Sequence, residues 1–194
     1  NWLRVMGEAQ SLGLTTSATN VIGFGEDFSA RIEHMKKIRN LQTHSLKHYG
    51  TGFTSFIAWP VQLETNTFGR RNRGQNKHVL GAGSSEYLRH LAISRLFLDN
   101  IEHIQASWPT MGIAVAQMAL LAGADDAGST MMEENVVSAS GTTKLDATET
   151  ELQSSIIRAG FKPRRRNSDY NRLDTTLLVP ELDELAAPPP LIML

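Results

Sequence analysis

Residues 15–26, TTSATNVIGFGE, decide the fold class, because a strand pattern ends there in a glycine turn that leads into a helix. Residues 15–22 are rich in Thr and other β-branched side chains, which favour a strand. The strand breaks at GFGE, and residues 28–43 then carry apolar side chains at helical spacing. The stretch therefore predicts one strand–helix unit.

The same unit recurs along the chain. Strands are predicted at 52–59, 104–108 and 127–132, and helices at 84–100, 111–122 and 148–159. Ser84 or Ser85 and Thr110 are the expected caps of the first two of these helices, and another helix runs from Trp2 to a stop at Gly13. Alternation of strands and helices indicates parallel strands covered by helices, the α/β class.

Right-handed crossovers permit either an open sheet or a barrel. Two features favour the C-terminal half of a (β/α)8 TIM-type barrel with about four parallel strands. The chain begins on a helix, and polar or unusual residues follow every predicted strand. In a complete barrel of about 250 residues these strand ends form one active-site rim. We expect residues 1–173 to form this half-barrel and the Pro-rich residues 174–194 to be a disordered tail.

Composition limits the classes of partner and chemistry. With 19 Lys and Arg against 20 Asp and Glu, the formal charge is −1, which argues against a dedicated nucleic-acid or membrane-surface binder. No apolar run approaches the ~20 residues of a membrane helix. The chain has no Cys, which excludes disulfides, a Cys nucleophile and a thiolate-held metal in these residues. This usage fits a cytoplasmic protein.

The turn Gly23-Phe24-Gly25-Glu26 is the first candidate site. Glycines between a strand and a helix let a backbone approach a ligand closely. The G-x-G-x-x-G spacing of a dinucleotide site is absent. Ligand contact and a plain tight turn are equally compatible with these residues.

Polar and aromatic side chains follow the other predicted strands and suit a polar ligand that carries a ring. Trp59, Gln62, Glu64 and Asn66 follow the second strand, Trp108 and Thr110 the third, and Glu133, Glu134 and Asn135 the fourth. Packing and capping explain any single one of them equally well. One such group at every strand end is harder to explain that way.

Two further patterns give weaker evidence for a functional site. His44 and His48 are spaced to share a helix face, but no H-E-x-x-H motif is present, and a solvated helix end is the favoured interpretation. We assign no metal ligand in the chain. The basic runs at 70–77 and 162–166 lack interleaved aromatic residues and are typical of solvated loops.

Several segments together resemble a specific family. They are ATNVIGFGE (18–26), GFTSFIAWPVQLETNT (52–67), EYLRHLAISRLFLDNI (86–101), IQASWPTMG (104–112) and DDAGSTMMEENVVSASG (125–141). They resemble the C-terminal half of the cyclic dehypoxanthine futalosine synthase family, radical S-adenosylmethionine enzymes of the futalosine route to menaquinone. The likeness covers about residues 1–173. The aminofutalosine synthases and the two halves of deazaflavin (FO) synthase look less similar.

The resemblance implies a (β/α)8 barrel, a 4Fe-4S cluster and S-adenosyl-L-methionine as cofactors, dehypoxanthine futalosine as the small-molecule substrate, and an electron donor such as flavodoxin or ferredoxin. The implied reaction takes hydrogen from the ribose C4′ and closes a ring onto the benzoate. The cofactors supply the radical, while the protein positions the reactants and excludes water.

The family's motifs match this chain at defined positions. The resemblance places Gly23, Gly25 and Glu26 beside S-adenosylmethionine. It places Ser107 and Trp108 in the substrate pocket, together with Trp59, Gln62, Glu64, Asn66, Thr110 and Asn135. Glu133 or Glu134 is the hypothetical catalytic proton acceptor. Relatives often carry His where this chain has Phe24.

One family motif is missing. The cluster motif C-x-x-x-C-x-x-C has no counterpart, because the chain contains no Cys. Together with Asn1 as first residue, this predicts a fragment that is inactive alone, with a degenerate protein as the alternative. A sister radical enzyme and a non-catalytic α/β binding module remain the competing functions.

Overall fold

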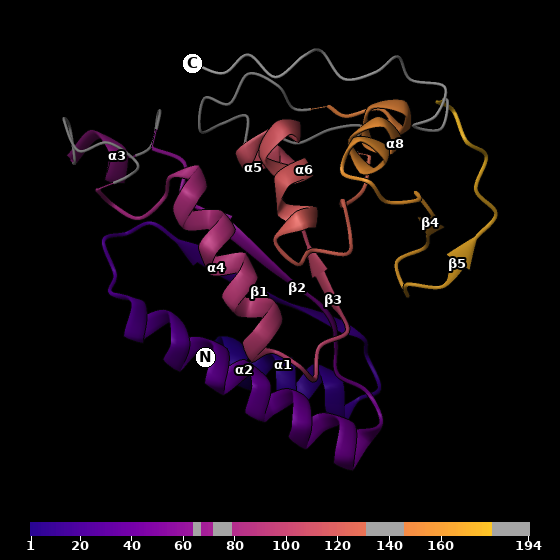
Figure 1. Ribbon diagram of the computed structural model, residues 1–194. Helices are drawn as coiled ribbons and strands as arrows, with labels where there is room; N and C mark the ends of the chain where they lie inside the picture. The colour runs from indigo at the N-terminus through magenta and orange to yellow at the C-terminus, as the bar shows by residue number, and fades with distance from the viewer. Residues whose placement is uncertain (64–66, 72–78, 131–145, 180–194) are drawn as a thin grey trace.

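Three parallel strands form the central sheet (Figure 1). The computed structural model describes residues 1–63, 67–71, 79–130 and 146–179. Strand β1 is Thr16–Ile22, β2 is Phe53–Pro60 and β3 is His103–Gln105, in the order β1-β2-β3. Both neighbouring pairs run parallel. The predicted α/β class is therefore confirmed, and the ends of β1 and β2 differ from prediction by one residue.

The fourth predicted strand, at 127–132, is wrong where the structure describes it. Asp126 forms an isolated parallel bridge with Gln105, and its carbonyl accepts a hydrogen bond of 2.8 Å from the Ala106 amide. Residues 127–130 form no strand, and 131 and 132 lie outside the described residues. Gly128 has φ 84°, a left-handed conformation that does not continue an extended strand.

Helices α1 (Trp2–Ser11) and α2 (Phe28–Tyr49) flank β1 in the chain. The Asp27 carboxylate caps α2 by accepting a 2.8 Å bond from the Ala30 amide. Helix α2 runs past its predicted end at residue 43, because residues 44–49 contain no helix breaker. It ends at Gly50, whose φ of 70° forms the left-handed cap.

Between β2 and β3 lie the short helix α3 (Thr67–Arg71), which the sequence did not predict, and α4 (Ser84–Phe97). Helix α4 ends three residues before its predicted end at residue 100. Its N-cap is Gly83, and no side chain caps it, so the predicted Ser84 or Ser85 cap is wrong.

The segment after β3 departs most from prediction. The strand predicted at 104–108 stops at Gln105, and Trp108 instead begins the short helix α5 (Trp108–Met111). Pro109 favours this helix start, because proline has no amide hydrogen for a strand ladder. Helix α6 (Ile113–Leu121) starts after Gly112, so Thr110 does not cap it. Among the described helices, none is long and apolar enough to cross a membrane.

Helix α8 (Glu149–Arg158) carries the predicted capping box between Thr148 and Glu151. After it, β4 (Arg165–Arg166) and β5 (Arg172–Leu173) form an antiparallel hairpin that the sequence did not predict. The first residues of the predicted tail contact α8, because the Gln153 side chain bonds to the backbone of Thr176 and Leu178 at 2.9 and 2.7 Å.

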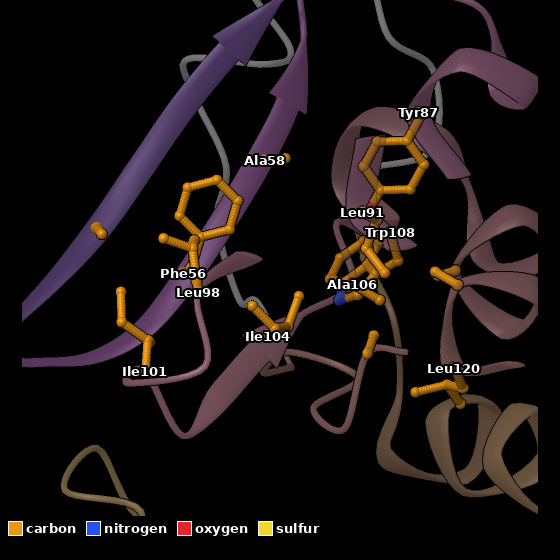
Figure 2. Close-up of a cluster of buried hydrophobic side chains, with 14 of the residues drawn as sticks. Phe56, Ala58, Tyr87, Leu91, Leu98, Ile101, Ile104, Ala106, Trp108 and Leu120 are labelled. Atoms are coloured by element: carbon orange, nitrogen blue, oxygen red, sulfur yellow. The ribbon is translucent and has the colours of Figure 1, made fainter. Parts of the chain in front are cut away.

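One face of the sheet packs against helices. Register places Ala18, Phe56 and Ile104 in one row, and all three are at most 1% exposed. Figure 2 shows Phe56 and Ile104 in the buried cluster that also contains Tyr87 and Leu91 of α4. This apolar layer is the core. Leu96, on the opposite side of α4, is 81% exposed.

The other face, which we term the open face, is more polar and less covered. Register aligns its side chains in three rows that run across the strands, and we number the rows from the amino ends of the strands. Val21 is 45% exposed and Trp59 is 37% exposed. The rows are Ser17, Ser55 and His103; Thr19, Ile57 and Gln105; and Val21 and Trp59.

Two leucines on α4 test this description of the core. Leu91→Ala is expected to lower the free energy of unfolding by about 2–5 kcal/mol, because it leaves a cavity beside the sheet. Leu96→Ala, on the exposed side of the same helix, is expected to change it by about 0.5 kcal/mol or less. Urea denaturation measures both, and equal losses in the two variants would contradict the assignment.

His90 is a buried histidine on the helix-covered face. Its ring is 0% exposed and its Nε2 lies 3.4 Å from the amide nitrogen of Asn20. Nδ1 has no partner among the described residues. Burial, assisted by the positive charge of Arg31, lowers the pKa of His90 to about 4. The imidazole is therefore neutral in the folded protein at neutral pH.

This depressed pKa predicts acid sensitivity. Between about pH 6.5, the ordinary histidine value, and pH 4, the unfolded chain protonates His90 while the folded protein does not. The free energy of unfolding should fall by up to about 3 kcal/mol as pH drops through that window. His90→Leu should show a shallower pH dependence than the exposed control His44→Gln. Identical slopes in the two variants would refute the assignment.

Candidate functional site

The turn after β1 is packed against residues 80–82. Gly23 has φ 100°, and a Cβ on it would lie 2.4 Å from the Ala82 Cβ, so only glycine fits there. The Gly25 amide donates to the Leu80 carbonyl at 3.1 Å. Close packing of this turn against its own protein explains Gly23 without a ligand.

Glu26 closes the turn. Its carboxylate accepts hydrogen bonds from the amides of Gly23 at 3.0 Å and Phe24 at 2.7 Å, and from the Arg31 guanidinium at 2.7 Å. Burial acts to raise the pKa of Glu26, but these hydrogen bonds outweigh it and lower the pKa. Glu26 is therefore ionised at neutral pH and holds the turn in shape.

Arg31 connects this turn to α4. Its side chain is 3% exposed and also donates to Glu86 at 2.8 Å and to the Gly81 carbonyl at 3.2 Å. Removing one member of such a buried charge network leaves an uncompensated charge. A hollow of about 230 Å³ lies beside the network, lined by residues that include Gly25 and Glu26.

Trp59 and Gln62 mark the end of β2. Trp59 lies on the open face at the carboxyl end of the strand, in register with Val21. The Gln62 side-chain amide donates to the Pro60 carbonyl at 2.9 Å and to the Thr110 carbonyl at 3.4 Å. Gln62 therefore joins the end of β2 to α5.

The end of β3 is tightly held. The buried Ser107 donates its amide to the Tyr87 hydroxyl at 2.8 Å, and its own hydroxyl lies 2.8 Å from that of Thr110. Trp108 is 2% exposed, and its indole nitrogen donates to the Ser129 carbonyl at 3.2 Å. Burial of Trp108 favours the packing interpretation for this ring.

The strand ends converge as the parallel order requires. The turn after β1, Trp59 and Gln62 after β2, and Ser107, Trp108 and Thr110 after β3 all lie at the carboxyl edge of the sheet. The other predicted site residues, Glu64, Asn66, Glu133, Glu134 and Asn135, lie outside the described residues.

Sequence reasoning missed a cluster on β4–β5. Asp126 is 7% exposed and accepts hydrogen bonds from Arg166 at 2.6 Å and from the Tyr170 hydroxyl at 2.6 Å. The cluster borders a cavity of about 620 Å³ between α8, the hairpin and residues 124–130. Asp126 lies 40 and 44 residues before Arg166 and Tyr170 in the sequence, so no local motif indicates the cluster.

The two implied cofactors need different ligands. Three thiolates hold a 4Fe-4S cluster in such enzymes, and this chain has no Cys, so the cluster does not fit these residues. For S-adenosylmethionine, the amides of Gly23, Phe24 and Gly25 are already engaged within the protein. Any contact there uses side chains or carbonyls, of which Phe24, 50% exposed, is the largest surface.

Proteins related in sequence match most of the length of this chain. The chain is 41% identical over 172 residues to a cyclic dehypoxanthine futalosine synthase of Streptomyces coelicolor. It is 37% identical over 174 residues to a 5-amino-6-(D-ribitylamino)uracil–L-tyrosine 4-hydroxyphenyl transferase of Methanosphaerula palustris. It is 34% identical over 173 residues to an aminodeoxyfutalosine synthase of Thermus thermophilus.

These matches cover most of this chain but less than half of each relative. The shares of this chain are 89%, 88% and 89%, and the shares of the relatives are 40%, 44% and 44%, in the same order. A family model described as the CofH/MqnC C-terminal region matches residues 50–178. Because that match covers more than half of the sequence, the chain belongs to the family of the CofH/MqnC C-terminal region.

Proposed function

We propose that these residues form the C-terminal, substrate-facing part of a radical S-adenosylmethionine cyclase that converts dehypoxanthine futalosine to cyclic dehypoxanthine futalosine. The observation that carries the proposal is the set of polar and aromatic groups gathered at one edge of a parallel sheet, from Trp59 through Gln62 to Thr110. The higher identity to a relative of that name, 41% against 37% and 34% for two others, supports this substrate.

The proposal includes the fold of the complete protein. Residues 1–173 are four consecutive units of a TIM-type barrel, with the fourth strand reduced to the Asp126 bridge among the described residues. The open face is then the barrel interior, which agrees with its polar rows and with its partial exposure in these residues. The predicted tail, residues 174–194, is joined to this domain at its start, because Thr176 and Leu178 bond to Gln153 of α8.

In this account each strand end has a separate task. Trp59 offers an exposed aromatic surface for an aromatic part of the substrate. The Ser107–Thr110 hydroxyl pair and Gln62 position polar groups of the ligand. The Glu26 network keeps the turn after β1 in a fixed shape beside S-adenosylmethionine. Glu133 or Glu134 accepts the proton released when the benzoate ring regains aromaticity.

The chain by itself has no ligands for the 4Fe-4S cluster. When bound, the cluster and S-adenosylmethionine supply the radical that removes a hydrogen atom from the substrate. The cluster ligands would have to come from outside these 194 residues, because the chain contains no Cys. A flavodoxin or ferredoxin is the proposed electron donor, and the cytoplasm the proposed location.

The direct test is an anaerobic assay of the full-length gene product with a reconstituted cluster. Dehypoxanthine futalosine is expected to be cyclised, with product identified by mass spectrometry. The aminodeoxyfutalosine synthase reaction and tyrosine transfer to 5-amino-6-(D-ribitylamino)uracil are run in parallel, because relatives with those names match at 34% and 37%. Turnover in either of these, without cyclisation, would overturn the proposal in favour of a sister enzyme.

Trp59 gives a residue-level prediction. Trp59→Ala should lower kcat/KM for dehypoxanthine futalosine by about tenfold or more, mainly through KM, because it removes a stacking surface. Its melting temperature should change little, since the ring is 37% exposed. The control is Tyr49→Ala, at the far end of α2, where the ring is 44% exposed. Equal kinetics in the two variants would remove Trp59 from the substrate pocket.

A further inference from the structure

The part of the open face on β2 is not equally exposed along its length. Ser55, in the first row, is 3% exposed, whereas Trp59, in the third row of the same strand, is 37% exposed. Both side chains lie on the face that the helices do not cover. Something other than the helices therefore covers the amino end of β2 on this face, whereas Ser17 of β1 in the same row is exposed.

The cover is the β4–β5 hairpin, which lies beside β3 in Figure 1. The Tyr170 ring stacks on His103 of the first row, with centroids 4.0 Å apart and planes within 7°. The Arg166 guanidinium lies over the Tyr170 ring, 4.2 Å from its centroid. Tyr170 is thus held between an imidazole and a guanidinium.

The hairpin is also bound to the sheet edge by charge. Arg166 donates two hydrogen bonds to the Asp126 carboxylate, at 2.6 and 3.1 Å, and Tyr170 donates a third at 2.6 Å. Asp126 pairs with Gln105, so its side chain belongs to the open face. Burial, then the bond to this carboxylate, raises the pKa of the Tyr170 phenol, which stays a donor at neutral pH.

The backbone of Tyr170 supports a specific role. Its φ is 61°, and it is the one non-glycine residue with positive φ among the described residues. A left-handed conformation is unfavourable for a bulky side chain and persists only where surrounding contacts impose it. Here the stack on His103, the Arg166 contact and the Asp126 bond together fix the ring over the first row.

We propose that the β4–β5 hairpin is a plug that closes the amino end of the open face over β2 and β3, with Arg166 and Tyr170 as positioning residues that act through Asp126. Ligands then reach the open face from the carboxyl ends of the strands, where Trp59 is exposed. This inference rests on the proposed function for its consequence: the plug keeps solvent from the rear of the reaction chamber, where water promotes side reactions.

The test measures chemical access to His103 and needs no cofactor. Diethyl pyrocarbonate modification of each histidine is followed by mass spectrometry, with the exposed His44 and His48 as references in the same molecule. In the protein without substitutions, His103 should react more slowly than both references. Tyr170→Gly, which removes the ring and suits the left-handed backbone, should raise the His103 rate about fivefold or more through local opening.

Matched variants separate the plug from general loosening. Arg166→Gln should also raise the His103 rate, whereas Arg164→Gln, an exposed arginine two residues earlier, should leave it unchanged. Thermal melts followed by circular dichroism check that each variant is folded. If Tyr170→Gly does not fold, the proposal is tested by the His103 rate in Arg166→Gln and by the slow reaction of His103 in the protein without substitutions. Fast labelling of His103 in the protein without substitutions would overturn the plug proposal. Equal His103 rates in Arg166→Gln and Arg164→Gln would also overturn it.

A second measurement addresses the consequence for the reaction. In the cyclisation assay, Tyr170→Gly should release about twofold or more 5′-deoxyadenosine, the spent form of the cofactor radical, per cyclised product. In an opened chamber the substrate radical takes an electron from the electron donor and a proton from solvent and returns to substrate instead of cyclising. Arg164→Gln should give the same ratio as the protein without substitutions. An unchanged ratio in Tyr170→Gly would overturn the solvent-exclusion role. If the protein without substitutions does not cyclise dehypoxanthine futalosine, this result counts against the proposed function and leaves the labelling result unaffected.

Discussion

The parallel, in-register pairing of β1 with β2 is the constraint on which the rest of the structure depends. It places Ala18 beside Phe56 on one face and Val21 beside Trp59 on the other. A shift by one residue would exchange the two faces and expose Phe56. Apolar burial against α2 and α4 selects this register, since Ala18, Phe56 and Ile104 are all at most 1% exposed. The position of every strand end follows from that choice.

The two ends of the open face have different surroundings. At the carboxyl end, Gln62 joins β2 to α5 and Trp59 remains accessible. At the amino end, Tyr170 covers His103 and, together with Arg166, binds Asp126. The turn at Gly23 adds a third fixed point, because Arg31 ties Glu26 to Glu86 of α4. Polar networks thus fix the borders of a face whose interior stays open.

Local patterns predicted the elements that local interactions stabilise. The β-branched run of β1 and the capping box of α8 were both found from sequence, because their signals lie within a few residues. The strand predicted at 104–108 failed, because Pro109 starts a helix where apolar residues suggested a longer strand. The buried side of α4 could not be read from its sequence, because apolar residues occur on both sides of the helix: Leu91 is buried and Leu96 is 81% exposed.

The site divides in the same way. Trp59, Gln62 and Thr110 could be proposed from strand ends, since parallel order alone brings them to one edge. The Asp126–Arg166–Tyr170 cluster could not, because it depends on tertiary contacts. The most direct measurement of the account is a crystal structure of the full-length protein with dehypoxanthine futalosine bound. The account predicts ligand density against Trp59 and Gln62, and density beside Tyr170 and His103 would contradict it.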